Sequence, residues 1–198
     1  MAATANGVLT RLIAVHKSLH KAGLDHAVGG ALALATYVYP PRGTVDIDLN
    51  LTADPAQPQR VLSALPRQVH IHAGAADELR SVSQVRLWWR SATLDTPIDL
   101  FLPASPMYHR LVVERAQPVA FLGTEIKVLT ATDLMVFKML FDRRKDWADI
   151  ESLIRSGAGD PEEAAAWVAQ ILCTADKRLA KLQEIRDEVA AEMDGAGG

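Results

Sequence analysis

The chain has 198 residues, of which 49% are hydrophobic and 23% are charged, and its formal net charge is −3 at pH 7. This length suits one core or a core with a helical appendage, and the net charge excludes attraction of nucleic acid by the molecule as a whole. Because Cys173 is the sole cysteine, the chain can form neither an intramolecular disulfide nor a cysteine cluster for zinc. No stretch approaches the length of a membrane span, so we expect a soluble cytoplasmic protein.

The front part of the chain predicts alternating helices and strands. Apolar residues at helical spacing predict an amphipathic first helix, and these are Val8, Leu12, Val15 and Leu19. Short apolar or alternating runs predict strands over residues 24–28, 44–51, 69–72, 82–89 and 98–102, then a hairpin of 119–122 and 125–129. Helices are expected over 31–37 and 105–115, while the prolines in residues 39–43 require a loop.

From residue 130 onward the pattern is helical. Thr130 resembles the start of a capping box for a helix over 134–142, and a second helix is expected over 146–154. Asp160 and Pro161 then cap a third, and a last helix carries Leu182 and its neighbours at helical spacing. The sequence therefore predicts an α/β domain over residues 1–129 and a helical domain over 130–198.

Asp46 and Asp48 stand two residues apart in the expected strand 44–51. Alternate residues of a strand face the same side, so both carboxylates would project together. Two adjacent carboxylates repel unless a cation neutralises them, and hard oxygen ligands of this kind suit magnesium. In isolation the pair would more simply be the solvated face of an edge strand.

The upstream context favours a site. Gly29 and Gly30 lie between a strand and a helix, where unobstructed backbone N–H groups would let a phosphate chain approach. A plain tight turn is the simpler reading of the two glycines alone. The order strand, Gly-Gly turn, helix, loop and strand with Asp-Ile-Asp resembles the signature of polymerase-β-type nucleotidyltransferases.

The resemblance implies an α/β (α+β) fold in which a mixed sheet with flanking helices precedes a helical C-terminal part. It also implies a third carboxylate on a later strand, for which Asp99 is preferred over Asp95. The stretch from Arg42 to Leu49, RGTVDIDL, is similar to the version found in AbiEii/MenT toxin nucleotidyltransferases. Ala31 departs from that group, many of whose members have serine there, and a hydroxyl contact to the triphosphate is lost or supplied elsewhere.

By this resemblance the cofactor is Mg²⁺ in a two-metal site and the substrate is an NTP, with CTP or another pyrimidine NTP favoured. Asp46 and Asp48 would hold one metal and share a second with Asp99, which would also accept the proton of the acceptor hydroxyl. The residues expected to contact the nucleotide are Gly29, Gly30, Arg42 and Lys138.

The helical part adds two expected site residues. Lys138 would be the fixed cation for the phosphates, although an ion pair with Asp142 explains its spacing almost as well. Asp149 is preferred over Asp146 as a functional acid, and both also fit the start of a helix.

A basic cluster, Arg143 to Lys145, is expected either as a solvated helix junction or as an RNA-backbone contact shared with Arg86 and Arg90. At most one of Trp88 and Trp89 is free to stack on a base. His70 and His72 are interpreted as surface histidines.

The resemblance further implies a toxin of a bacterial toxin–antitoxin pair that adds nucleotides to the 3′ acceptor end of tRNA and so blocks aminoacylation and translation. A cognate antitoxin is the expected partner. If that antitoxin is a kinase, the resemblance makes Thr44 its candidate site, and a phosphate there would add roughly two negative charges beside Asp46 and Asp48. Two alternatives stay open. One is a small-molecule, antibiotic-type nucleotidyltransferase, and the other is a catalytically degenerate antitoxin or binding module.

Overall fold

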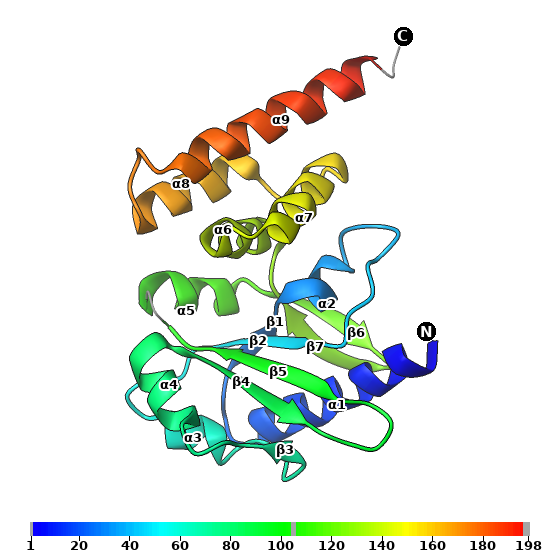
Figure 1. Cartoon of the computed structure of the whole chain (residues 1–198), viewed down its shortest axis with the longest axis vertical. Helices are drawn as coiled ribbons and strands as arrows, with labels where there is room; N and C mark the ends of the chain where they lie inside the picture. Colours follow the sequence, from blue (N-terminus) through cyan, green and yellow to red (C-terminus); the bar gives the residue numbers. More distant parts are fainter. Residues whose placement is uncertain (1, 104–105, 196–198) are drawn as a thin grey trace. The chain divides into compact units, whose positions relative to one another are not determined.

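A computed structural model describes residues 2–103 and 106–195 of the chain (Figure 1). It has two compact units. The first comprises Met1–Ala33 with Arg42–Leu129, and the second comprises Leu34–Pro41 with Thr130–Gly198. The first unit is mixed α/β and the second is helical, which confirms the predicted fold class. The predicted domains 1–129 and 130–198 differ from these units by residues 34–41.

The α/β unit is built on one mixed sheet, which has seven strands within the described residues and the order β3-β4-β5-β2-β1-β7-β6. The pairs β2–β5 and β1–β7 are parallel, and the other neighbours are antiparallel. The strands are β1 (His26–Val28), β2 (Ile47–Leu51), β3 (Val69–His70), β4 (Gln84–Trp89), β5 (Thr96–Phe101), β6 (Gln117–Phe121) and β7 (Thr124–Val128).

The core of this unit lies on the central strands. Ile47 and Leu49 of β2 and Ile98 and Leu100 of β5 have no exposed surface. Strands buried on both faces are expected to be nearly continuous apolar runs. Asp99, which is only 4% exposed, interrupts such a run and therefore needs a specific partner.

Five helices accompany the sheet within the described part of the unit: α1 (Ala2–Lys21), α2 (Gly30–Leu34), α3 (Pro58–Leu62), α4 (Ala75–Val82) and α5 (Pro106–Glu114). The predicted apolar stripe of α1 is buried. The sequence analysis missed α3 and α4, although Pro58 at the first turn of α3 is a helix-start signal. The helix predicted over 105–115 is α5, and Ser105 lies outside the described residues.

Several predicted strand starts were wrong. The strand predicted over 44–51 begins at Ile47, because Thr44 Oγ1 accepts the N–H of Asp46 at 3.0 Å, a local contact that competes with ladder pairing. The strand predicted over 82–89 begins at Gln84, because α4 continues to Val82 and ends with left-handed Ser83. The predicted hairpin is confirmed, with Leu122 and Gly123 both at positive φ in its turn.

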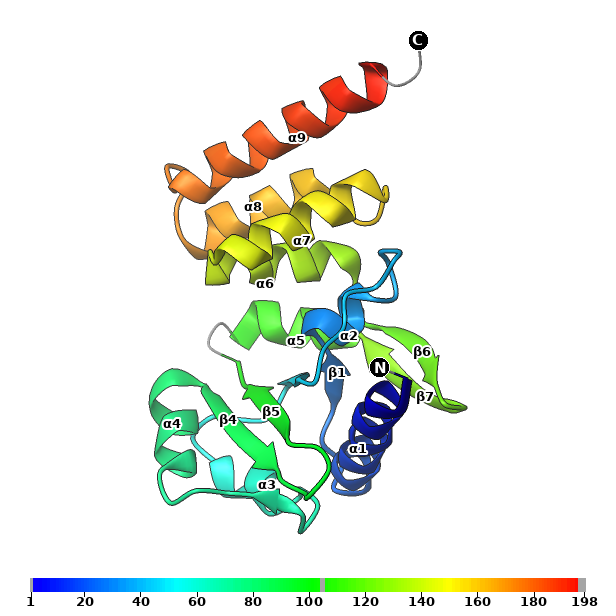
Figure 2. The same ribbon diagram turned by 45° about the vertical axis from the view of Figure 1, so that its right-hand side comes forward.

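The helical unit contains α6 (Ala131–Phe141), α7 (Arg144–Arg155), α8 (Pro161–Ile171) and α9 (Lys177–Gly195). Its predicted caps are confirmed, since Thr130 accepts the N–H of Asp133 and Asp160 accepts that of Glu163. Helix α6 packs on α7 and α8, and α9 packs on the same two helices from the other side (Figure 2). No helix among the described residues is long and apolar enough to cross a membrane.

Candidate active site

The Gly29-Gly30 turn brings the start of α2 against the side chain of Asp48. Gly30 has φ +57°, and a Cβ placed there would lie 1.8 Å from Asp48 Oδ2. The Gly29 N–H donates to the Asp48 carbonyl at 2.9 Å. The expectation of unobstructed N–H groups at both glycines was therefore wrong for Gly29. The second glycine is required because any side chain would displace the Asp48 carboxylate.

Asp48 and Asp99 lie side by side on two neighbouring strands. They are direct partners in the parallel register of β2 and β5, so their side chains leave the same face of the sheet about 5 Å apart at the backbone. Asp99 is buried and Asp48 is half-buried. Asp95, the competing choice, lies in the loop before β5 and accepts the Ser91 N–H at 3.2 Å. The structure therefore places Asp99, and not Asp95, beside Asp48.

Asp46 is positioned by a turn and not by the strand. It is half-buried, it directly precedes β2, and its N–H donates to Thr44 Oγ1. The shared strand face predicted for Asp46 and Asp48 is therefore not how these two side chains are brought together. Asp46 still lies near the same charges, because it contributes with Asp48 to the electrostatic environment of Arg86.

Arg86 of β4 is the residue that the sequence analysis did not assign to this site. It is the antiparallel partner of Asp99, and it donates from Nε to Asp99 Oδ1 at 2.8 Å and from Nη2 to Oδ2 at 2.6 Å. These contacts, and then the charges of Asp46 and Asp48, raise the pKa of the guanidinium above its usual value. The Arg86 side chain is 51% exposed and that of Asp99 is 6% exposed, so the pair opens to solvent on the arginine side.

The donor set fits a divalent cation in its chemistry. Asp46, Asp48 and Asp99 offer only carboxylate oxygens, the ligands that magnesium prefers. Within the described residues, however, no group of three such side chains is already gathered for a metal. The Arg86 guanidinium supplies the positive charge that the buried Asp99 requires. A cation bound to Asp99 would either share the carboxylate with Arg86 or take the place of Arg86.

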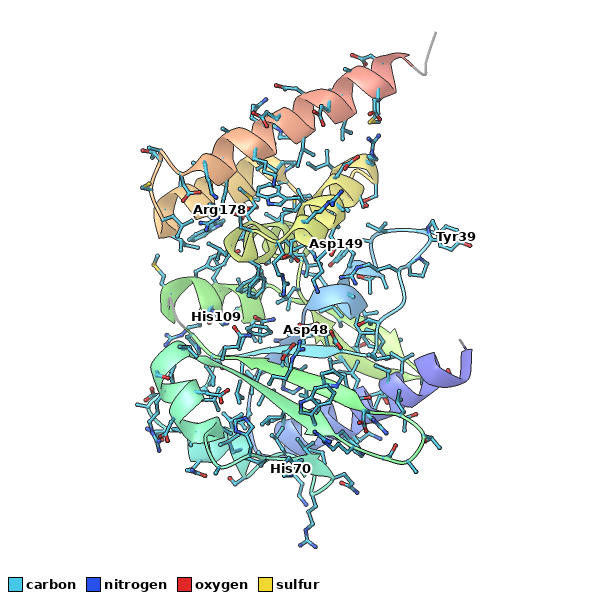
Figure 3. The ribbon with its side chains drawn as sticks, viewed as in Figure 1. Tyr39, Asp48, His70, His109, Asp149 and Arg178 are labelled. Atoms are coloured by element: carbon cyan, nitrogen blue, oxygen red, sulfur yellow. The ribbon has the colours of Figure 1, made fainter. Side chains whose placement is uncertain are left out.

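The two expected site residues of the helical unit contact each other. Lys138 of α6 is 5% exposed, and its Nζ donates to Asp149 Oδ2 of α7 at 2.5 Å. Its Nζ also lies 3.8 Å from Asp146 Oδ1, and Arg143 Nε donates to Asp146 Oδ2 at 2.6 Å. Four charged side chains thus form one ion network that ties α6 to α7 (Asp149 is labelled in Figure 3).

Asp142, the helix-surface partner considered for Lys138, takes another role. It ends α6 in a left-handed conformation, its Oδ1 accepts Trp147 Nε1 at 2.8 Å, and Lys177 and Arg178 lie 3.4 and 3.6 Å from its Oδ2. The Lys138 side chain turns instead to the buried acids of α7, a choice that spacing within one helix cannot reveal.

The remaining candidates lie on the surface or in loops. Arg42 is exposed in the loop before β2, and Arg144 and Lys145 are exposed in the first turn of α7. The Arg90 guanidinium lies 5.6 Å from the centre of the Trp88 ring. His70, labelled in Figure 3, is exposed on β3.

Comparisons with known proteins give weak likenesses only. No protein-family model matches the chain, and no curated protein matches it significantly. It is similar to the structure of an antigenic nucleotidyltransferase-like protein from Paracoccidioides brasiliensis, with 17% identity, TM-score 0.46 and coverage of 87% of this chain and 92% of that one.

Two further solved structures cover the whole of this chain and 97% of their own. They are JHP933 from Helicobacter pylori, with 15% identity and TM-score 0.47, and the antibiotic-resistance factor ANT(2'')-Ia, with 12% identity and TM-score 0.40. Because every TM-score is below 0.5, the function proposed next depends on the site geometry and the sequence motif alone.

Proposed function

We propose that this protein is a metal-dependent nucleotidyltransferase. One observation carries the proposal: Asp48 and Asp99 are register partners on adjacent parallel strands, and the Gly30 turn closes directly on the Asp48 carboxylate. A turn that admits no side chain lets the Asp48 carboxylate lie directly against the start of α2, beside the aligned Asp99, and aligned carboxylates of this kind suit a divalent cation.

In this proposal the three acids have different roles in the transfer of a nucleoside monophosphate. Magnesium, when bound, would neutralise the triphosphate and lower the pKa of the attacking hydroxyl. Asp46 and Asp48 would hold it at the end of β2, and Asp99 would accept the hydroxyl proton once Arg86 has released its carboxylate. Pyrophosphate would leave as the hydroxyl attacks the α-phosphorus, and the residues act mainly by positioning and by neutralising charge.

The finer assignment depends on the resemblance of residues 42–49 to toxin nucleotidyltransferases. In this assignment the protein is the toxin of a toxin–antitoxin pair. The acceptor is the 3′ end of tRNA, and the donor is CTP or another pyrimidine NTP. Arg42 and the exposed Arg144 and Lys145 are the cations proposed for nucleotide and RNA phosphates. Lys138 and Asp149 stay in the proposal as residues that fix the helical unit and act on phosphates only if their ion pair opens.

Thr44 is proposed as the regulatory position for the antitoxin. Its Oγ1 already accepts the N–H of Asp46, so a phosphate on that oxygen would end this contact and place roughly two negative charges beside the acids. We expect Thr44→Glu to reduce transfer at least about tenfold and Thr44→Val to reduce it less. Equal activity of the two variants would remove Thr44 from the regulatory scheme.

The deciding experiment incubates the purified protein with total tRNA, Mg²⁺ and each labelled NTP in turn. Asp48→Asn is compared with Asp77→Asn, a control that alters an acid exposed on α4 of the same unit. The proposal expects label in tRNA with wild type and with Asp77→Asn, and a loss of more than about 100-fold with Asp48→Asn. No incorporation by folded wild-type protein into tRNA or small hydroxyl compounds would overturn it.

A second candidate is a catalytically inactive binding module. The observation that favours it is the Arg86–Asp99 pair, which already satisfies the acid that a transferase would use. The two are separated by the wild-type result, because a binding module would retain tRNA or antitoxin binding and show no incorporation in the wild type or in any variant. Label that enters a small hydroxyl compound but not tRNA would instead identify the small-molecule nucleotidyltransferase.

A further inference from the structure

A pocket lies at the other end of β1 from the Gly29-Gly30 turn. It has a volume of about 440 Å³, and three of its lining residues are His16 and His20 of α1 and His26, the first residue of β1. His26 and the turn are separated by the length of β1, about 10 Å along the strand. The pocket is therefore distinct from the acids of the candidate active site.

Two of the imidazoles are held in a fixed arrangement. His16 Nδ1 lies 2.9 Å from His26 Nε2, and His26 Nδ1 lies 2.7 Å from the Leu24 carbonyl oxygen. A carbonyl oxygen can only accept, so His26 donates from Nδ1 and its Nε2 carries the lone pair. A backbone carbonyl on one ring nitrogen is the outer partner that commonly orients a metal-binding histidine for ligation through the other nitrogen.

The third imidazole is within reach of this pair. His20 stands one helical turn after His16 on the same face of α1, and their rings stack with centroids 5.8 Å apart. His20 is exposed, so its side chain can rotate without disturbing the core. Two nitrogens bound to one zinc ion lie about 3.4 Å apart, so the 2.9 Å separation between His16 Nδ1 and His26 Nε2 needs to open by only about half an ångström.

The charge of the pocket also favours a cation. Burial, and then the neighbouring histidines, lower the pKa of His16 to about 4, and burial lowers that of His26, so both rings are neutral at pH 7 and have lone pairs to offer. Asp25 and Glu125 line the pocket with two negative charges against the one positive charge of Lys127. Neutral imidazoles beside carboxylates suit zinc and similar transition-metal ions better than magnesium.

We propose that His16, His20 and His26 form a binding site for a divalent transition-metal ion of the zinc class, separate from the candidate active site. Among the described residues no three ligands are already in place, so binding requires His20 to turn toward the pair. His16 would change to the tautomer with its proton on Nε2, which leaves Nδ1 free to bind the metal opposite His26 Nε2. Asp25 or Glu125 is within the same pocket as a fourth, oxygen ligand.

Titration calorimetry of the full chain with Zn²⁺, in millimolar Mg²⁺ to occupy the carboxylate site, tests this proposal. We expect one zinc ion per chain, and binding at least about tenfold weaker in His20→Ala, which changes an exposed residue and leaves the core intact. Co²⁺ in place of zinc should give the visible absorption of a nitrogen-ligated, four-coordinate site, and this spectrum should be lost in His16→Ala.

The double variant His70→Ala/His72→Ala is the control, since it removes two histidines at β3 and just beyond it, away from this pocket. It should bind zinc as the wild type does. The proposal is overturned if the wild type binds no zinc, if His20→Ala binds it as tightly as wild type, or if the control variant loses it. None of these outcomes depends on nucleotide transfer.

Discussion

The buried carboxylates of the two units differ in how exposed their cationic partners are. In the α/β unit Asp99 is neutralised by Arg86, whose side chain is 51% exposed, and its register partner Asp48 is only half-buried. In the helical unit the side chains of the Lys138–Asp149 pair are only 6% and 8% exposed, although the neighbouring Asp146 also pairs with Arg143, which is 53% exposed. An ion pair with one side in water can exchange its partner for a ligand, whereas a fully enclosed pair mainly joins helices.

The comparison favours the acids of the strands for the proposed chemistry and the Lys138–Asp149 pair for joining α6 to α7. It also explains why the sequence motif alone could not separate the two roles, since both groups consist of aspartates and a basic residue.

The largest effect is expected from Asp149→Ala in the enclosed network. It leaves the Lys138 ammonium buried without its nearest carboxylate and should lower the free energy of unfolding by about 3–5 kcal/mol in urea denaturation. Replacing Lys138 by Met together with Asp149 by Leu should recover most of this loss. Arg155→Ala, which removes exposed pairs with Glu151 and Glu192, is the control and should cost below about 1 kcal/mol.

A loss of under about 1 kcal/mol in Asp149→Ala would show that the network exchanges with water as readily as the Arg86 pair does, and the contrast between the units would then fail.

Acidification should weaken the α/β unit selectively, because all six histidines of the chain lie in it. Burial lowers the pKa of His109 from 6.5 to about 4, so the unfolded chain takes up a proton at a higher pH than the folded one. The stabilisation is complete above pH 6.5 and is lost as the pH falls toward 4, by about 3 kcal/mol at roughly 1.4 kcal/mol for each unit of pKa.

His109→Gln should flatten this part of the pH dependence. Hydrogen exchange at pH 7 and pH 4.5 is the measurement, and protection in α6 to α9 should not follow the histidine titration. Equal loss of protection in the helical unit would contradict the assignment of the effect to His109 and its unit.

Gly30→Ala tests the close approach to Asp48. A Cβ at φ +57° and 1.8 Å from Asp48 Oδ2 should cost about 2–3 kcal/mol and should abolish nucleotide transfer, because the carboxylate has to move. Gly123→Ala is matched in having positive φ, +79°, but its Cβ would meet no atom within 4 Å. The control should lose only about 1 kcal/mol and keep its activity. Similar losses in both variants would mean that φ alone, and not Asp48, requires Gly30.

The smallest effect is expected from Arg86→Gln. Because the side chain is half exposed and a glutamine amide can still donate one hydrogen bond to the buried Asp99 carboxylate, we expect a loss of about 1 kcal/mol in the free energy of unfolding. Mg²⁺ should stabilise this variant more than the wild type in thermal unfolding, since the cation can then occupy the carboxylate that the guanidinium held. Equal stabilisation by Mg²⁺ in both proteins would show that Arg86 and the metal do not share Asp99.

Features that depend on neighbours along the chain could be predicted from the sequence. The apolar stripe of α1, the hairpin around Gly123, and the helix caps at Thr130 and Asp160 all follow from short-range spacing, although the hairpin turn lies one residue earlier than predicted. The same is true of the fold class, because alternating strand and helix patterns followed by helical ones leave few architectures.

Contacts between side chains that are far apart in the sequence could not be predicted in this way. Arg86 reaches Asp99 because β4 and β5 pair in one particular register, and Lys138 turns to Asp149 because α6 packs on α7. His16 meets His26 only because α1 lies beside β1. Such contacts depend on the register and packing of separate elements, and a one-residue shift in a strand would turn each of its side chains to the opposite face.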